Sequence, residues 1–522
     1  MEEIVMKKLG DIYFGHTDAK NELLGSDERK RADFETTFLK PANLKIDSFQ
    51  SGKKYYIYGL KGTGKTALLR YIDIQLRKDK SNETSFVLFK SDFSEDDKQG
   101  LGRQAAMVSA VDYNQIRELK QEQNNDFELV WRWFFLNRIL TCMEEKNICF
   151  FRNDNEWMKF RRHMDALRTS DNKSIFPKIK RGMVAICAKF PPLGFGEVSA
   201  EIESGSDNQK VKFSSFVHTA EEQFGKLHID TNKRLYLLLD ELELGHINKK
   251  KEYDRDVKII RDLIIVANKL NSLFREKKFP FYIIVSVRSE VLSAVSSIGK
   301  EINKCIEDFG ALISWHQYGG DEKEHPLIKL IVKRLLLAEN LEETPHNIKT
   351  VWSEYFPDEH IQKQSVERYI LHNSWYRPRD IIRFLNLAKD MFPDHDSFSH
   401  NVFDGIRKTY SERSWTECLE ELKVHYTQNE LEIIEDAFTG WMRSFSMDLF
   451  VKRIHDIGKG GSVNLDIRRV LSILYNVGVI GNKYIDENFK RHKFRFNFRG
   501  DKKILHDKDM MVHNALYPYF SL

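Results

Sequence analysis

The stretch that decides the fold is Lys54-Tyr-Tyr-Ile-Tyr-Gly-Leu-Lys-Gly-Thr-Gly-Lys-Thr-Ala-Leu-Leu69. Its apolar start, residues 55–58, predicts a strand, and its end, from Lys65 onward, predicts a helix. Between them, Gly59, four further residues and Gly64-Lys65-Thr66 satisfy the pattern G-x-x-x-x-G-K-[ST]. Because the pattern follows a predicted strand and precedes a predicted helix, it predicts a phosphate-binding loop.

The residue types of this loop suit the triphosphate of ATP and Mg²⁺. Glycines let successive backbone N–H groups point inward around a phosphate, toward which the following helix turns its positive end. Lys65 can reach the β- and γ-phosphates, and the Thr66 hydroxyl can ligate Mg²⁺. The candidate nucleotide-binding residues of the loop are Gly59, Gly62, Gly64, Lys65, Thr66 and Ala67.

Length and composition narrow the class of protein. A chain of 522 residues is long enough for about three or four domains, and 41% hydrophobic with 31% charged residues is typical of a soluble globular protein. The net charge of +4 is small, so any basic surface must be local. Five scattered cysteines without a C-x-x-C pair, no signal peptide and no apolar run of about 20 residues predict a cytoplasmic protein without membrane contact.

A second motif, Arg234-Leu-Tyr-Leu-Leu-Leu-Asp240-Glu241, places two acids after five apolar residues. This predicts a buried parallel strand that ends at the ligand edge of an α/β sheet. We expect Asp240 to hold Mg²⁺, directly or through water, and Glu241 to polarise the attacking water. Glu243 is interpreted as a solvated or metal-adjacent acid. The alternative is a strand followed by an acidic turn.

A third strand, predicted over Phe279–Arg288, ends in Ser286-x-Arg288. A polar and a basic residue at the tip of a neighbouring strand would lie close to the γ-phosphate, so both are candidate site residues. In the alternative interpretation, Arg288 pairs with a surface acid such as Glu290.

Arg379 is a further candidate, in Arg377-Pro378-Arg379-Asp380. Proline favours the first helical turn, so Arg379 is expected at the start of a helix, from which it could swing toward the phosphates. The alternative is a terminal charge that pairs with Asp380 or Asp390.

The last segment, from Ser411, carries three short predicted helices, over 430–438, 447–454 and 467–476, and then a strand of period two, residues 494–499. Phe494, Phe496 and Phe498 are expected to point inward. This order predicts a winged helix, and the hairpin region is basic, which suits phosphate contact. Because many winged helices bind protein instead, DNA and protein remain open as partners.

Four regions follow from these motifs. They are an N-terminal segment packing on the core (1–50), an α/β P-loop domain with a parallel sheet (51–320), a helical lid (321–410) and a winged-helix domain (411–522). An α+β insertion at about 95–230 interrupts the second region, and alternating residues between Phe176 and Phe216 predict a β-hairpin or ribbon within it.

This order of motifs resembles the AAA+/STAND class of P-loop ATPases with a C-terminal winged helix. It is most similar to a bacterial group of P-loop ATPases often encoded near phage-defence genes, a group that Phe14-Gly15 and Ile313-Ser-Trp315 also suit. The resemblance covers nearly the whole chain, although between Glu95 and Thr231 it rests on no motif.

The resemblance implies specific roles for the candidate residues. Ser286 and Arg288 correspond to the polar-x-Arg sensor of the class, and Arg379 to the arginine of its lid sensor. Asp240 supports the metal and Glu241 activates water, which makes Glu241, Arg288 and Arg379 the catalytic candidates. No arginine finger can be assigned, although hydrolysis in this class commonly needs a neighbouring subunit.

The expected function is that of an ATP-hydrolysing switch or assembly ATPase in anti-phage defence. Its expected partners are further copies of itself and an effector encoded nearby. Two alternatives stay open: a DNA-binding initiator or regulator like the origin-recognition ATPases, and a nucleotide-stabilised scaffold that holds a toxic partner with negligible turnover.

Overall fold

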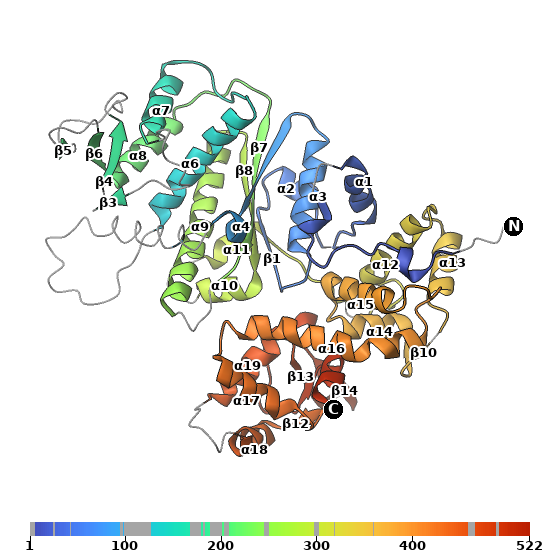
Figure 1. Cartoon of the computed structure of the whole chain (residues 1–522). Coiled ribbons are helices and arrows are strands. Elements are labelled where there is room, and N and C mark those ends of the chain that lie inside the picture. Colours follow the sequence, from blue (N-terminus) through green and yellow to red (C-terminus); the bar gives the residue numbers. More distant parts are fainter. Residues whose placement is uncertain are drawn as a thin grey trace.

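The structure is a computed structural model of the chain (Figure 1). It describes residues 6–23, 27–41, 43–93, 98, 127–167, 179–180, 183–187, 201–202, 208–244, 250–296, 302–317, 319–358, 360–457, 465–486 and 490–522. Among these residues, no helix has both the length and the apolar character needed to cross a membrane.

The centre of the fold is a five-stranded parallel sheet in the order β2-β7-β8-β1-β9. Its strands are β1 (Tyr56–Gly59), β2 (Asn82–Leu88), β7 (Arg234–Leu242), β8 (Phe281–Arg288) and β9 (Gly310–Leu312). The apolar runs of β7 and β8 are buried because helices cover both faces of the sheet. Since the strands are parallel, the predicted loop and the predicted acidic and basic strand ends meet at one edge.

Helices form a layer on each side of this sheet (Figure 1). On one side lie α1 (Glu28–Thr37), α2 (Ile46–Gln50) and α3 (Lys65–Arg77). On the other lie α6 (Glu128–Glu145) and the long α9 (Lys250–Glu276). Short helices follow individual strands: α4 (Phe89–Asp92), α10 (Ser289–Ser296) and α11 (Asn303–Phe309). The core is therefore a three-layer α/β unit.

The segment between β2 and β7 has its own helices, α7 (Asn155–Asp165) and α8 (Phe213–Phe224), and a small antiparallel sheet. The sheet has four strands in the order β3-β4-β6-β5, with bounds Ile179–Lys180, Met183–Cys187, Asn208–Lys212 and Glu201–Ile202. The sequence predicts only a hairpin or ribbon here. Much of the predicted 95–230 insertion lies outside the described residues.

Five helices follow the sheet: α12 (Pro326–Ala338), α13 (Pro345–Tyr355), α14 (Val366–Asn373), α15 (Pro378–Met391) and α16 (His400–Leu422), with a short β10–β11 hairpin (His360–Ile361, Gln364–Ser365) between α13 and α14. Proline occupies the first turn of α12, α13 and α15, as expected from its fixed φ. Helix α16 runs without interruption through residues 410 and 411, where the sequence predicts a boundary.

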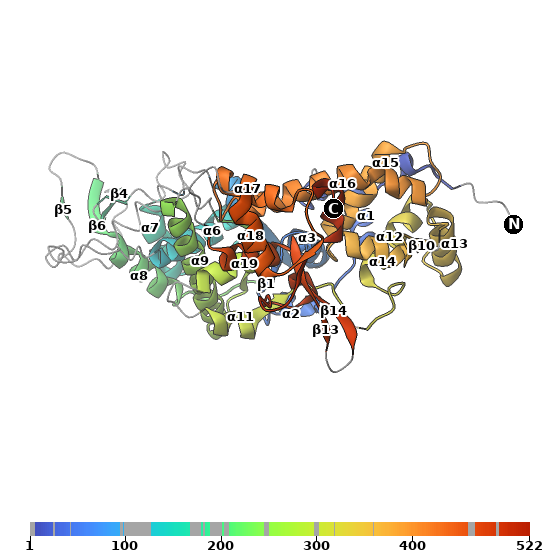
Figure 2. The ribbon, with the colours of Figure 1, turned by 90° about the horizontal axis from the view of Figure 1, so that it is seen from below.

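The last segment contains the three predicted helices, as α17 (Gln428–Phe438), α18 (Met447–Ile457) and α19 (Ile467–Val477). They pack with an antiparallel sheet in the order β12-β15-β13-β14, with bounds Ser444–Phe445, Met510–Val512, Ile480–Asp486 and Arg491–Arg495. The chain ends after α20 (Tyr517–Phe520). Hairpin β13–β14 projects from the body of the molecule (Figure 2).

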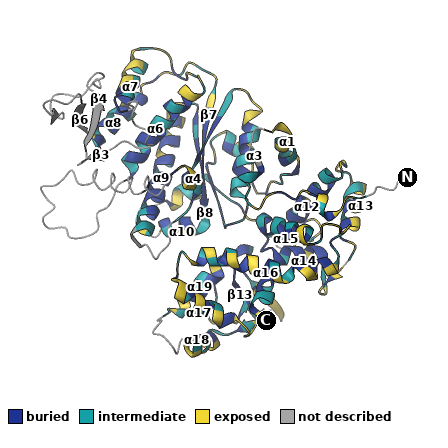
Figure 3. Cartoon of the chain, in the orientation of Figure 1, coloured by how far each residue is buried: buried dark blue, intermediate teal, exposed yellow. Residues whose placement is uncertain are grey.

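The prediction that Phe494 points into the core is wrong. Its side chain is 41% exposed, whereas Phe496 and Phe498 are buried. Strand β14 ends at Arg495, and Phe498 lies in a 3-10 turn, so the strict alternation does not continue to residue 499. Phe494 belongs to β14, in which residues 491–494 are all exposed, whereas strands β7 and β8 of the central sheet are mostly buried (Figure 3).

Candidate active site at the carboxyl edge of the sheet

The predicted loop joins β1 to α3 and has the backbone shape of an anion cradle. Gly62 and Gly64 have φ of 80° and 91°, values that favour glycine, and Gly64 caps α3. The Thr63 hydroxyl donates to the Leu60 carbonyl at 2.8 Å and closes the turn. Free N–H groups of the first turn of α3 therefore lie beside the loop, with the positive end of the helix dipole.

Lys65, the first residue of α3, is folded into this loop. Its ammonium donates to the carbonyls of Gly59 at 3.0 Å and Leu60 at 2.9 Å. Burial lowers the pKa of Lys65 to about 8. The charge of Lys65 is thus held at the loop, within reach of an anion bound there.

Asp240 and Ser286 place unpartnered polar atoms at the ends of β7 and β8. Asp240 Oδ2 and Ser286 Oγ are both buried and have no hydrogen-bond partner among the described residues. Burial raises the pKa of Asp240, and the nearby Thr66 and Ser286 hydroxyls partly oppose that rise. Buried polar atoms without partners are costly, so they mark a place where a ligand would be stabilising.

Glu241 follows with an unusual backbone. Its φ is 61°, and the pairing of β7 with β8 shifts register between Leu239 and Leu242. The carboxylate accepts from the Ser91 N–H at 3.0 Å and hydroxyl at 2.6 Å, and from Lys20 Nζ at 3.4 Å. Non-glycine residues with positive φ cluster at functional sites, and here the strained backbone aims a fixed carboxylate across the sheet edge.

Arg288 does pair with an acid, but its main partner is Glu243. The two form a close ion pair, while Glu290 lies 3.9 Å away. Glu243 also contacts Lys90 at 3.0 Å. Although burial opposes the change, Arg288 and Lys90 hold the pKa of Glu243 below its usual value. Glu243 is therefore paired with two cations, which replaces the solvated alternative of the sequence interpretation and leaves the metal-adjacent one as a prediction.

Arg379 lies against the loop, as predicted, at the start of α15. Its backbone N–H donates to the Gly62 carbonyl at 3.4 Å, and a Cβ on Gly62 would lie 3.5 Å from Arg379 Cβ. Its guanidinium donates to Glu417 at 3.0 Å and to the Thr17 carbonyl at 3.2 Å. Arg379 pairs with neither Asp380 nor Asp390, the two acids expected from sequence. Asp380 instead accepts a hydrogen bond from Arg383 at 2.9 Å.

Three further residues at the loop, Lys61, Trp315 and Glu417, were not predicted as site residues from the sequence. The Trp315 indole donates to the Thr63 carbonyl at 2.9 Å, although in the sequence Trp315 appears only as part of a resemblance. Lys61, inside the loop, contacts Glu417 of α16 at 2.8 Å. A motif search could flag Lys61 by its position, but nothing local in the sequence marks a glutamate in the middle of a helix.

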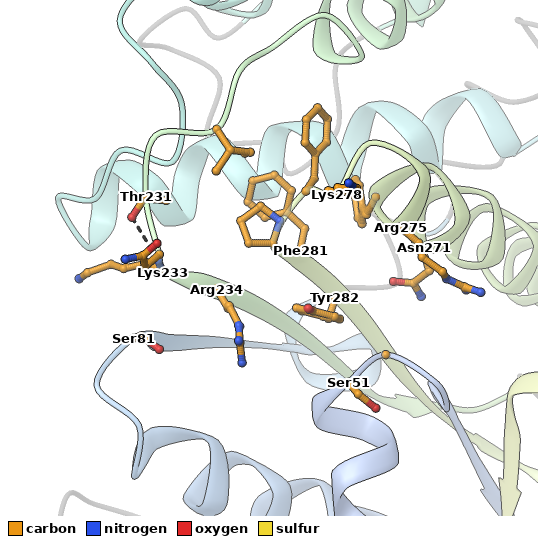
Figure 4. Close-up of a pocket in the computed structure, with 16 residues that line it drawn as sticks. Ser51, Ser81, Thr231, Lys233, Arg234, Asn271, Arg275, Lys278, Phe281 and Tyr282 are labelled. Atoms are coloured by element: carbon orange, nitrogen blue, oxygen red, sulfur yellow. Dashed lines mark hydrogen bonds between the residues drawn. The ribbon is translucent and has the colours of Figure 1, made fainter.

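A cavity of about 630 Å³ lies at the opposite, amino edge of the sheet (Figure 4). Its lining includes Ser81, Lys233, Arg234, Lys278 and Tyr282. Parallel α/β sheets bind ligands at the carboxyl ends of their strands, so this cavity is at the wrong edge for the predicted chemistry.

Comparisons with known proteins match only part of the chain or match it weakly. A model of the FunZ-associated C-terminal helical domain matches residues 325–419, which include α12 to α15 and most of α16. A solved structure, Drosophila ORC bound to DNA, is similar over 88% of each chain with 10% identity and a TM-score of 0.23, too low to carry a structural argument. No curated protein gives a significant match.

Proposed function

We propose that this chain is a Mg²⁺-dependent P-loop ATPase of the AAA+/STAND kind, with its nucleotide at the carboxyl edge of the sheet. The observation that carries the proposal is the pair of buried, unpartnered oxygens of Asp240 and Ser286 beside a glycine loop that holds Lys65. Phosphate and metal would satisfy groups that the protein leaves unsatisfied.

The residues present fit ATP and Mg²⁺. Thr66 and Asp240 would hold the metal, which when bound neutralises charge that develops on the phosphates. Lys65 would exchange its two loop carbonyls for β- and γ-phosphate oxygens. Glu241 would orient a water for in-line attack on the γ-phosphate, and Ser91 with Lys20 would keep its carboxylate in place.

The proposed use of this chemistry is to switch or drive an assembly. The resemblance to ATPases near phage-defence genes supports a defence role with an effector partner and further copies of the chain. A scaffold that binds ATP but scarcely hydrolyses it is the rival within the same fold.

The rate of ATP hydrolysis by the purified full chain, measured with and without DNA, distinguishes the ATPase, the scaffold and the initiator. We expect ATP hydrolysis that requires Mg²⁺ and stops with a chelator. ATP binding without turnover would favour the scaffold, and turnover that depends strongly on DNA would favour an initiator or regulator. Absence of ATP binding at any Mg²⁺ concentration would overturn the proposal.

DNA binding is the second candidate function, and hairpin β13–β14 favours it. If the last segment acts as a winged helix, this hairpin is its wing. It projects from the molecule, and its residues Lys490, Arg491 and Lys493 are exposed (Figure 2). Exposed cations on a projecting hairpin can follow a phosphate backbone without sequence preference.

Reversal of Lys490, Arg491 and Lys493 to Glu tests this function. Arg495 is left unchanged because it is half-buried and pairs with Asp501 at 3.1 Å, whereas the contact of Lys493 with Asp486, at 3.5 Å, is at an exposed position. The variant should melt like wild type, and its DNA affinity should depend less on salt, by about 0.9 in log–log slope per lost phosphate contact on duplex. Wild-type protein that binds no DNA at low salt with ATP present would exclude an initiator.

A further inference from the structure

Glu417 of α16 binds three cations at the joint between the loop and the helices after it. Its Oε1 forms an ion pair with Lys61 Nζ at 2.8 Å and accepts from an Arg379 N–H at 3.0 Å. Lys61 Nζ also donates to Glu420 at 3.3 Å. Its Oε2 accepts from an Arg383 N–H at 2.9 Å. Both carboxylate oxygens are thus engaged by side chains from two parts of the chain, the loop and α15.

Two of these cations belong to the candidate site. Lys61 lies within the loop with its side chain only 8% exposed. Arg379 touches Gly62 through its backbone, and its charge is near enough to Lys65 to contribute to the lowered pKa of that lysine. A phosphate in the loop would therefore lie close to both cations, whose charges are already engaged by Glu417.

A carboxylate and a phosphate compete for the same donors. Guanidinium groups bind both in similar fork-like geometry, and such charge-assisted hydrogen bonds are among the strong ones in proteins. Glu417 accepts from Arg379 Nη1, and the Thr17 carbonyl accepts from Arg379 Nε. To bind a γ-phosphate with the paired N–H groups that Glu417 now shares, the guanidinium has to leave Glu417, and only a ligand that gains more from Arg379 than Glu417 does can bring this about.

We propose that Glu417 is an internal competitor of the terminal phosphate, which latches Arg379 and Lys61 until ATP, but not ADP, displaces it. This inference rests on the proposed ATPase function and adds its regulation. Helix α16 packs on both α15 and α20. A movement of α16 on release of Glu417 would therefore change its contacts with the last segment of the chain.

The latch is set to respond to ligand and not to acidity. Although burial opposes it, Lys61, Arg383 and Arg379 lower the pKa of Glu417 to about 2. The carboxylate therefore stays charged throughout the physiological range, and only competition for its partners opens the contact.

Glu417→Gln tests the latch through nucleotide affinity. Removing the charge should free Arg379 and tighten ATP binding on the order of 10-fold, within the usual range of coupling between sites, while ADP affinity changes little. Glu412→Gln is the matched control, because Glu412 is exposed on the same helix and its side chain forms no ion pair within the described residues. In an Arg379→Ala background, Glu417→Gln should give a smaller gain, because only Lys61 is then left to be released, as a double-mutant cycle would measure.

The outcomes are separable. A Glu417→Gln variant that melts like wild type and binds ATP no tighter, or more weakly, overturns the latch. Loss of ATP binding in Lys65→Ala together with an inert Glu417→Gln removes the latch but keeps the proposed function. Absence of ATP binding in both wild type and Glu417→Gln overturns both, whereas binding by Glu417→Gln alone supports the latch.

A measurement on the unaltered protein covers the case in which Glu417→Gln does not fold. Hydrogen exchange of α16 amides around residue 417 should rise when ATP is added and stay unchanged with ADP, since only ATP brings the competing phosphate. Equal exchange with both nucleotides, under conditions where both bind, would overturn the latch.

Discussion

The two edges of the parallel sheet differ in which groups they leave unsatisfied. The amino edge has the large cavity, yet none of its described lining side chains has a buried polar atom without a partner. Both side-chain atoms of Asn271 bond to the backbone of Ile283, and Lys233 pairs with Glu83. The carboxyl edge has no such cavity among the pockets described, yet Asp240 Oδ2 and Ser286 Oγ are buried without partners in the described chain.

This difference shows that empty volume is a weaker sign of function than unsatisfied chemistry. A surface hollow costs little, because water fills it. A buried oxygen without a hydrogen bond costs about 1–3 kcal/mol, and such groups persist where a ligand or an ion repays that cost. The carboxyl edge is therefore the better candidate for binding.

The largest expected effect is on ATP binding, and it is expected from replacing a lysine at the carboxyl edge but not from replacing one at the amino edge. Lys65→Ala should abolish ATP binding, because it removes the cation that reaches the terminal phosphates. Lys233→Ala, in the wall of the amino-edge cavity, should bind ATP like wild type. Titration with labelled ATP measures both, and equal losses in the two variants would break the distinction between the edges.

Replacing one of the two carboxyl-edge acids should slow hydrolysis without loss of binding. Glu241→Gln should reduce turnover on the order of 10²–10⁴, the usual contribution of a positioned acid–base group, with ATP still bound. Glu243→Gln is the matched variant, since Glu243 is committed to Arg288 and Lys90. If Glu243→Gln slows hydrolysis and Glu241→Gln does not, the catalytic role belongs to Glu243.

A smaller effect is expected from the arginines. Arg288→Ala and Arg379→Ala should each lower turnover more than ATP affinity, because both are proposed to sense the γ-phosphate. Arg275→Ala, from the lining of the amino-edge cavity, serves as control and should change neither. Wild-type behaviour of both site variants would make them structural arginines and remove the main support for a sensing lid.

The smallest effect concerns stability and pH at Glu421, one helical turn beyond Glu417. Burial raises the pKa of Glu421 from 4.5 to about 7. A raised acid pKa means that the folded state favours the protonated carboxyl. The contribution of Glu421 to folding stability is therefore fully present below pH 4.5 and is lost as the pH rises through 7. Glu421→Gln should therefore raise the melting temperature by roughly 1–3 °C at pH 8 and by less at pH 5.

Thermal melting of wild type and both glutamine variants at these two pH values checks this prediction. Glu420→Gln, at an exposed position on the same helix, should show no such difference. A shift at pH 5 equal to that at pH 8 would mean that Glu421 is ionised in the fold across this range.

Local chemistry made much of this molecule predictable. Strands β1, β7 and β8 are apolar runs, and β7 and β8 end in polar residues, so these three strands and the edge where Lys65 and Asp240 meet follow from pattern alone. Strand β9, three residues long and half-buried, has no such pattern and was not predicted. The three helices after residue 427 were predicted from the same periodicity, and their bounds agree within a few residues.

Contacts between distant segments could not be predicted in this way. Phe494 has the same alternating pattern as Phe496, but whether a strand residue is buried depends on what packs against it, and within the described residues Phe494 remains 41% exposed. The partner of Arg379 was expected among neighbouring acids and proved to be Glu417, 38 residues away.

The amino-acid sequence by itself thus determines the loop, the main strands and the chemical groups at each strand end, because these features depend on residues that are close in the chain. The pairing of those charges depends on the chain path, which brings α15 and α16 onto the loop and leaves Asp240 Oδ2 without a partner. The interaction between two charges depends on their distance in space, and that distance is set only when the chain has folded.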